Sequence, residues 1–269
     1  MKIGVFDSGL GGLITIRAII EKLPKYDYLY LGDTARVPYG NRSQETIYRF
    51  AEEAVSYLFR QNCGLVIIAC GTASANALRL LQQQYLPKNY PDRRILGVII
   101  PLAEETVKIT VLKRVGILAT KSTVSSSAFV REITKLSPKI RVFQQAAPLL
   151  VPLIENNGLK WIKPILKEYL CPLLARRIDT LVLGCTHYPL LKKAIREVAG
   201  SAVSTVSPDE IIPVRLADYL TRHPEMENRL DKASLRQYCI TDLTEGMAIS
   251  SKKLFGKNIK LERITIENT

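Results

Sequence analysis

Short apolar runs alternate with helical patterns along most of the chain. Four early runs lack the alternation of a strand with one exposed face: residues 3–6, 28–31, 65–69 and 95–99. Such runs are typical of parallel strands that are covered on both faces. Between two of these runs, apolar residues recur three and four positions apart, which predicts a long helix beginning near Ser43. The pattern therefore predicts an α/β fold with mostly parallel sheets.

The second half of the chain resembles the first. Val-Gly-Ile-Leu-Ala-Thr at residues 115–120 echoes Ile-Gly-Val-Phe-Asp-Ser at residues 3–8. Each half then reaches a strand followed by a cysteine, Cys70 or Cys185, after a nearly equal number of residues. This spacing predicts an internal duplication, in which two pseudo-duplicated α/β domains face each other.

The end of the chain is expected to return to the first unit. Its pattern predicts two helices and two strands in alternation: residues 211–220, 237–240, 246–254 and 259–266. The sequence therefore predicts two domains, of which the first is built from two separate segments of the chain and the second from one continuous segment. The first comprises residues 1–97 with 209–269 and carries Asp7 and Cys70; the second comprises residues 98–208 and carries Glu155, Cys185 and His187.

Composition narrows the class of protein. The chain has 269 residues, of which 47% are hydrophobic, as in ordinary globular proteins. The apolar stretch near the N-terminus is too short for a secretory signal, and no run approaches the roughly 18 residues of a membrane span. We therefore expect a cytoplasmic location and no membrane association.

The net charge of +13 raises the question of nucleic-acid binding. Lys and Arg are scattered along predicted helices, with no long block and no interleaved aromatic residues. This distribution favours a solvated surface, so nucleic acid is not an expected partner. A positive potential would instead attract an acidic metabolite.

Five cysteines without a Cys-x-x-Cys spacing predict neither a disulfide framework nor a zinc site. We expect Cys63, Cys171 and Cys239 to be small buried residues. Cys70 and Cys185 differ, because each follows an expected strand and precedes an expected helix. Loops of this kind bind ligands in open α/β sheets, and the helix N-terminus lowers the pKa of a thiol there.

Other candidates accompany the two thiols. The loop from Asp7 to Gly12 is glycine-rich but matches neither the dinucleotide fingerprint, because Ile14 replaces the third glycine, nor a P-loop. It is either an anion-binding loop or a tight turn. His187 has an ordinary pKa near neutrality and is either a proton-transfer partner for a thiol or a buried structural residue. Glu155 is a charged residue at the end of an apolar stretch, and we expect its side chain to be exposed to solvent.

Two thiols at equivalent strand ends suit inversion at a carbon atom. One group must remove a hydrogen from one face while another delivers a hydrogen to the opposite face, and thiols with an ordinary pKa of about 8.5 can do both. Asp7 on one side, and His187 with Glu155 on the other, are placed to tune or relay the protons. No feature suggests a pyridoxal phosphate site or a metal, so no cofactor is expected.

Four motifs carry a resemblance to a known family: residues 3–12, 30–40, 68–74 and 183–189. They resemble the glutamate racemases of the aspartate/glutamate racemase superfamily, cofactor-independent enzymes that supply D-glutamate for peptidoglycan. The resemblance implies that Cys70 and Cys185 are the proton-transfer bases, assisted by Asp7, Glu155 and His187. We also expect a homodimer. The resemblance places the following residues at the substrate: Asp7, Ser8, Pro38, Tyr39, Gly40, Gly71, Thr72, Thr120, Thr186 and His187.

The chain departs from the family pattern at Gly71, where an Asn is usual, and at Ile100, Leu102 and Ala119. Loss of one neutral hydrogen bond costs roughly 0.5–1.5 kcal/mol, so we expect weakened or retuned substrate binding rather than lost activity. Two alternatives stay open. In the first alternative, the chain is a racemase of aspartate or another amino acid. In the second, it is a catalytically weakened relative kept as a binding or regulatory protein, for instance one acting on DNA gyrase.

Overall fold

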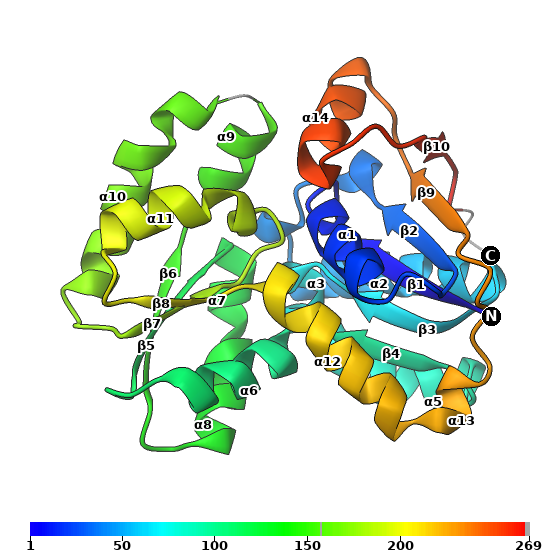
Figure 1. Ribbon diagram of the computed structural model, residues 1–269, viewed down its shortest axis with the longest axis horizontal. Coiled ribbons are helices and arrows are strands. Elements are labelled where there is room, and N and C mark those ends of the chain that lie inside the picture. The colour runs from blue at the N-terminus through cyan, green and yellow to red at the C-terminus, as the bar shows by residue number, and fades with distance from the viewer. Residues whose placement is uncertain (157, 267–269) are drawn as a thin grey trace.

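The computed structural model describes residues 1–156 and 158–266, and its strands form two parallel sheets (Figure 1). The six-stranded sheet has the order β10-β9-β2-β1-β3-β4, and the four-stranded sheet has the order β6-β5-β7-β8. The prediction of an α/β fold with parallel sheets is confirmed. The strands are β1 (Lys2–Asp7), β2 (Tyr28–Gly32), β3 (Cys63–Ile68), β4 (Arg94–Gly97), β5 (Arg114–Ala119), β6 (Arg141–Ala146), β7 (Thr180–Leu183), β8 (Ser204–Val206), β9 (Arg236–Ile240) and β10 (Glu262–Arg263).

One strand order occurs twice. In each half, the first strand lies between the second and the third, and the fourth pairs with the third, so that β2-β1-β3-β4 corresponds to β6-β5-β7-β8. The central strands β1, β3, β5 and β7 are buried almost throughout, which explains their continuous apolar runs. This common order supports the expected duplication, whereas the domain boundaries stay a prediction.

Helices cover both sheets (Figure 1). Ser43 begins the long helix α2 by accepting a hydrogen bond from the Thr46 amide, and the apolar face of this helix is buried, as its spacing predicts. The α-helices are α1 (Gly12–Lys22), α2 (Gln44–Arg60), α3 (Gly71–Asn76), α4 (Leu78–Leu80), α5 (Leu86–Asn89), α6 (Ile99–Ile109), α7 (Lys121–Ser126), α8 (Ala128–Leu136), α9 (Leu150–Glu155), α10 (Ile162–Leu174), α11 (Lys192–Ala199), α12 (Pro208–Arg222), α13 (Pro224–Glu227) and α14 (Glu245–Phe255).

Several expected elements have different limits. The strand at 95–99 ends at Gly97, because the backbone turns helical at Val98 and α6 follows. The last strand, expected over 259–266, consists only of Glu262 and Arg263. The helix after Cys185 begins as a 3-10 turn, and Gly200 ends it at a φ of +80°.

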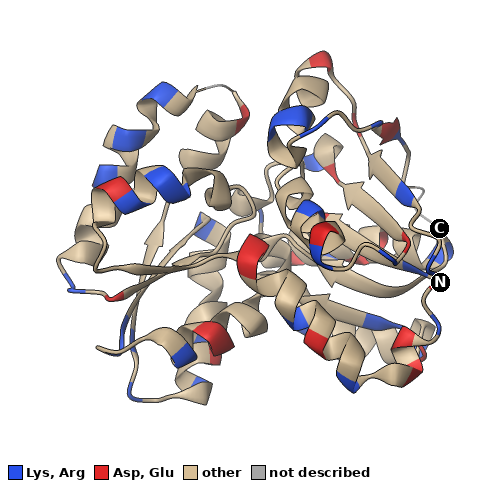
Figure 2. Cartoon of the chain, in the orientation of Figure 1, with Lys and Arg blue, Asp and Glu red and all other residues tan. Residues whose placement is uncertain are grey.

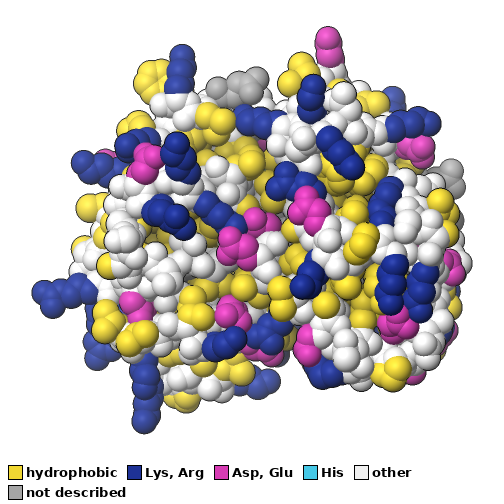
Figure 3. Space-filling view, viewed as in Figure 1, with side chains coloured by type: hydrophobic (Ala, Val, Ile, Leu, Met, Phe, Trp, Pro, Cys, Tyr) yellow, Lys and Arg dark blue, Asp and Glu magenta, His cyan; other side chains and the backbone are white. Residues whose placement is uncertain are grey.

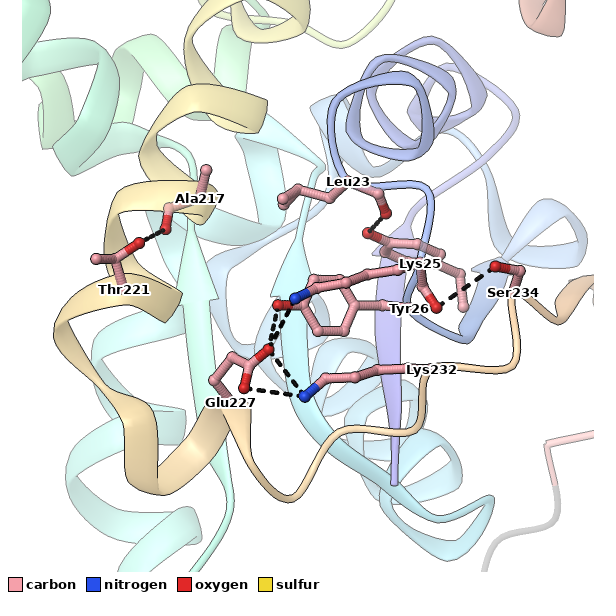
Figure 4. Close-up of polar contacts among 9 residues, drawn as sticks. Leu23, Lys25, Tyr26, Ala217, Thr221, Glu227, Lys232 and Ser234 are labelled. Carbon is pink, nitrogen blue, oxygen red and sulfur yellow. Dashed lines mark hydrogen bonds and ion pairs between the residues drawn. The ribbon is translucent and has the colours of Figure 1, made fainter.

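The chain returns to the six-stranded sheet through a polar anchor (Figure 4). Glu227 accepts hydrogen bonds from the Tyr26 hydroxyl at 2.7 Å and from the ammonium groups of Lys25 and Lys232. These contacts lower the pKa of Glu227 to about 2. The buried carboxylate of Asp27 accepts from two backbone amides of the same segment. The segment before β9 is therefore fixed beside β2.

Lys and Arg are distributed over the helices and loops of both halves (Figure 2). In the face drawn in Figure 3, their side chains lie among acidic and apolar ones. Within residues 1–156 and 158–266, none of the helices combines the length and apolarity needed to span a bilayer.

Candidate active site

A cavity of about 210 Å³ lies where the strand-end loops of the two sheets meet. It is smaller than the roughly 300 Å³ at which pockets for drug-sized ligands begin, and therefore suits a small metabolite. The cavity is lined by almost every residue that the sequence assigned to the site: Ser8, Pro38, Tyr39, Gly40, Cys70, Gly71, Thr72, Thr120, Glu155, Cys185, Thr186 and His187.

Cys70 lies two residues after the end of β3 and caps helix α3. Its Sγ accepts a hydrogen bond from the Ala73 amide at 3.4 Å and lies 3.2 Å from Ser8 Oγ. Burial, reinforced by the nearby charge of Asp7, raises the pKa of the Cys70 thiol to about 12. The expected lowering by the helix N-terminus is thus outweighed by desolvation. Cys70 is a neutral thiol at pH 7.

Cys185 belongs to a chain of three polar groups. Its Sγ lies 3.8 Å from His187 Nδ1, and His187 Nε2 lies 2.8 Å from Glu155 Oε1. Burial alone would lower the pKa of His187, but its hydrogen bonds to Cys185 and Glu155 raise it to about 10. The imidazole is therefore protonated at pH 7, and the two cysteines have different electrostatic surroundings.

Asp7 lies beneath the glycine-rich loop and does not itself line the cavity. Its carboxylate accepts hydrogen bonds from the Gly9 amide at 3.1 Å and from Thr186 Oγ1 at 3.2 Å. Burial raises the pKa of Asp7, and the charge of His187 and these hydrogen bonds offset only part of that rise. Because Thr186 follows β7, this contact joins the two sheets at the site.

Hydroxyl groups form a second link between the sheets. Thr72 Oγ1 lies 2.8 Å from Thr120 Oγ1, which lies 2.9 Å from Thr123 Oγ1. Tyr39 differs from these groups, because its hydroxyl donates to the buried carboxylate of Asp33 and is already engaged. Thr72 and Thr120 thus place a second pair of side-chain hydroxyls between the two sheets, beside the contact of Thr186 with Asp7.

One wall of the cavity was missed by the sequence reasoning. Ala147 and Pro148 line it from the segment that joins β6 to α9, and Val151 and Pro152 line it from the first turn of α9. They are apolar and carry no chemical motif. Their position after a strand was the only sequence feature that could have placed them at the site. That strand, β6, is too polar to be predicted from its sequence. Lys121 also lines the cavity. Among the residues that the structure describes, no other Lys or Arg lines it.

Of the remaining cysteines, Cys63 and Cys239 are buried as expected, but Cys171 is exposed. The prediction for Cys171 was wrong because the buried face of α10 is formed by Ile162, Leu166, Leu170 and Leu173. Within residues 1–156 and 158–266, no group of three or more His, Cys, Asp or Glu side chains is arranged to hold a metal ion.

The fold and the cavity together define a class of protein: an α/β enzyme whose site is enclosed by the carboxyl ends of two parallel sheets, with a thiol from each. The chain belongs to the Asp/Glu/Hydantoin racemase family, whose model matches residues 11–211.

Its relatives include glutamate racemases that align with this chain over nearly their whole length. The glutamate racemase of Sulfurihydrogenibium sp. is 45% identical over 100% of this chain and 98% of its own length. That of Geobacter metallireducens is 38% identical over 98% of this chain and 97% of its own length. The crystal structure of the Francisella tularensis glutamate racemase in complex with D-glutamate superposes with a TM-score of 0.89 at 30% identity, covering 99% of this chain and 98% of that one.

Proposed function

We propose that this protein interconverts L- and D-glutamate without a cofactor, using Cys70 and Cys185 as two bases. The observation that carries the proposal is that the two thiols line one small cavity although they follow strands of different sheets. A substrate carbon held between them would have one sulfur on each face. The similarity to glutamate racemases supports glutamate as the substrate.

The electrostatics support a proton transfer in which Cys70 is the initial proton donor. In one direction the thiolate of Cys185, stabilised by the neighbouring His187 imidazolium, removes the α-proton. The two electrons of the C–H bond remain on the substrate as a carbanion. The neutral Cys70 thiol then delivers its own proton to the opposite face, which leaves a Cys70 thiolate and a Cys185 thiol. In the reverse direction the Cys70 thiolate removes the proton and the Cys185 thiol delivers one.

The cavity also offers partners for a dicarboxylate. Lys121 supplies a positive charge at its wall, and Ser8, Thr72 and Thr120 supply hydroxyl groups. Ammonium and hydroxyl donors are suited to carboxylate oxygens. We therefore propose that Lys121 and these hydroxyls hold the substrate carboxylates while the two sulfurs flank the α-carbon.

A circular-dichroism assay of the purified protein with L-glutamate, D-glutamate and both enantiomers of aspartate tests the substrate. The proposal predicts that each glutamate enantiomer approaches the racemic mixture at least tenfold faster than aspartate does. Faster turnover of aspartate would favour the alternative racemase. No turnover of either would favour the weakened binding or regulatory relative.

The same resemblance supports three further proposals: a supply of D-glutamate for peptidoglycan, a cytoplasmic location and a homodimer. Growth of a D-glutamate auxotroph after expression of this chain tests the first. Cell fractionation tests the second, and sedimentation velocity tests the third.

A further inference from the structure

The two cysteine loops meet main chain to main chain at Gly71 and Gly184. A Cβ atom placed on Gly71 would lie 2.2 Å from the Gly184 carbonyl oxygen and 3.2 Å from its carbonyl carbon. Ordinary contacts of a Cβ atom begin at about 3.4 Å. Any side chain at position 71 therefore requires one of the two loops to move by about 1 Å.

Gly184 has little room to retreat. Its amide donates to the carbonyl oxygen of Leu118 at 2.8 Å, which ties it to the neighbouring strand β5. On its own Cβ side lie Ala119 Cβ at 2.9 Å and the ring of Phe129 at 3.1 Å from an added Cβ. The obstruction at Gly71 is consequently rigid backbone rather than the end of a flexible side chain.

Gly71 is also restrained by the first turn of its own helix. Helix α3 begins at this residue, and its first turn is fixed by the bond from the Ala73 amide to Cys70 Sγ and by the bond from Ser74 Oγ to the Ile68 carbonyl at 2.8 Å. A shift of Gly71 would therefore move the Cys70 loop as a unit. Since Gly71 follows Cys70 and Gly184 precedes Cys185, the contact is adjacent in sequence to both sulfurs.

Other contacts between the loops involve side chains that can adjust. Thr186 Oγ1 donates to Asp7, and Thr72 Oγ1 contacts Thr120 Oγ1. Hydroxyl groups rotate, so these contacts tolerate small changes in the separation of the sheets. The contact between Gly71 and Gly184 does not, and it limits how closely the two sheets approach at the site.

We propose that Gly71 is a positioning residue: the absence of a side chain there sets the separation of the two strand-end loops, and thereby the gap in which the substrate carbon lies between Cys70 and Cys185. The kinetic part of this inference rests on the proposed function; the structural part does not. It differs from the expectation that Gly71 merely lacks a substrate contact, because an amide side chain at this position requires the two loops to move apart.

The kinetic consequence follows from the geometry of proton transfer. A displacement of about 1 Å at the reacting atoms costs roughly 10²-fold in rate. Lys121 and the hydroxyl groups that are proposed to hold the carboxylates remain in place, so substrate binding changes less. Gly71→Ala and Gly71→Asn are therefore expected to lower kcat about 10²-fold while KM changes by less than about fivefold.

The test combines kinetics with structure. Gly71→Ala, Gly71→Asn and the control Gly246→Ala are compared with the parent; Gly246 lies in α14 with nothing within 4 Å of an added Cβ. Crystal structures of the parent and Gly71→Ala report the distance between the two sulfurs. The expected result is a sulfur separation larger by about 1 Å, a kcat about 10²-fold lower and a control equal to the parent.

Each other outcome is decisive. A Gly71→Asn enzyme with the kcat of the parent or higher overturns the inference, as does an unchanged sulfur separation. A Gly71→Ala protein that does not fold also overturns it, because Gly71 would then be required for packing rather than for positioning. If the parent does not racemise glutamate but the sulfurs of Gly71→Ala move apart, the proposed function fails and the structural inference stands.

Discussion

Replacing Glu155 by Gln tests the electrostatics of the Cys185 side. The change keeps the size of the side chain but removes the charge that lies 2.8 Å from His187 Nε2. A hydrogen bond to a charged group contributes about 1.5–3 kcal/mol, which corresponds to roughly one to two pKa units. The pKa of His187, raised to about 10 in the parent, is therefore expected to fall toward its ordinary value of 6.5.

The sign of the pH dependence follows from the direction of this shift. Because the folded-state pKa of His187 lies above the ordinary 6.5, its protonation adds stability that is fully present below about pH 6.5 and is lost as the pH rises through about 10. If the imidazolium supports the Cys185 thiolate, the alkaline limb of the pH–rate profile moves down by about one to two pH units in Glu155→Gln.

Proton NMR measures this shift directly, since the chain contains only two histidines. Glu225→Gln is a matched control, because Glu225 pairs with the exposed His223 at 3.1 Å in the same way and lies outside the cavity. We expect the control to leave the His187 titration and the pH–rate profile unchanged. An unaltered His187 titration in Glu155→Gln would refute the reasoning.

Three further predictions concern the rest of the site. Cys70→Ser and Cys185→Ser should each lower kcat for both enantiomers by about 10²–10⁴-fold, as polarimetry would measure; full activity of either would exclude it as a base. Thr186→Val should lower the free energy of unfolding by about 1–3 kcal/mol in urea titrations, because Asp7 loses a buried hydrogen bond, and a loss below about 0.5 kcal/mol would contradict this. Lys121→Met should raise KM for glutamate by up to about fivefold with kcat within about threefold, and an unchanged KM would remove Lys121 from the proposed carboxylate site.

The features that sequence patterns predict well here are those that local chemistry determines. Buried parallel strands need continuous apolar runs, so β1, β3 and β7 were found from their residues alone. Their carboxyl ends meet in the fold, and that is why motifs far apart in the chain line one cavity.

What the sequence could not predict depends on neighbours in space. The helical pattern after Cys70 is interrupted in the structure, where α3, α4 and a π-helical segment at Leu81–Tyr85 replace one continuous helix. The raised pKa of Cys70 is a result of burial, which a motif does not reveal. The obstruction at Gly71 likewise comes from a carbonyl group more than one hundred positions away in sequence.

The central claim is that separate sulfurs act on the two faces of one carbon, and racemisation in D2O measures it most directly. With either enantiomer of glutamate as substrate, the product of the opposite configuration should carry deuterium at the α-carbon from its first appearance, because the delivering thiol exchanges with solvent. Mass spectrometry of the separated enantiomers at less than about 10% conversion gives the label content. Product that keeps its original α-hydrogen would contradict two-base transfer.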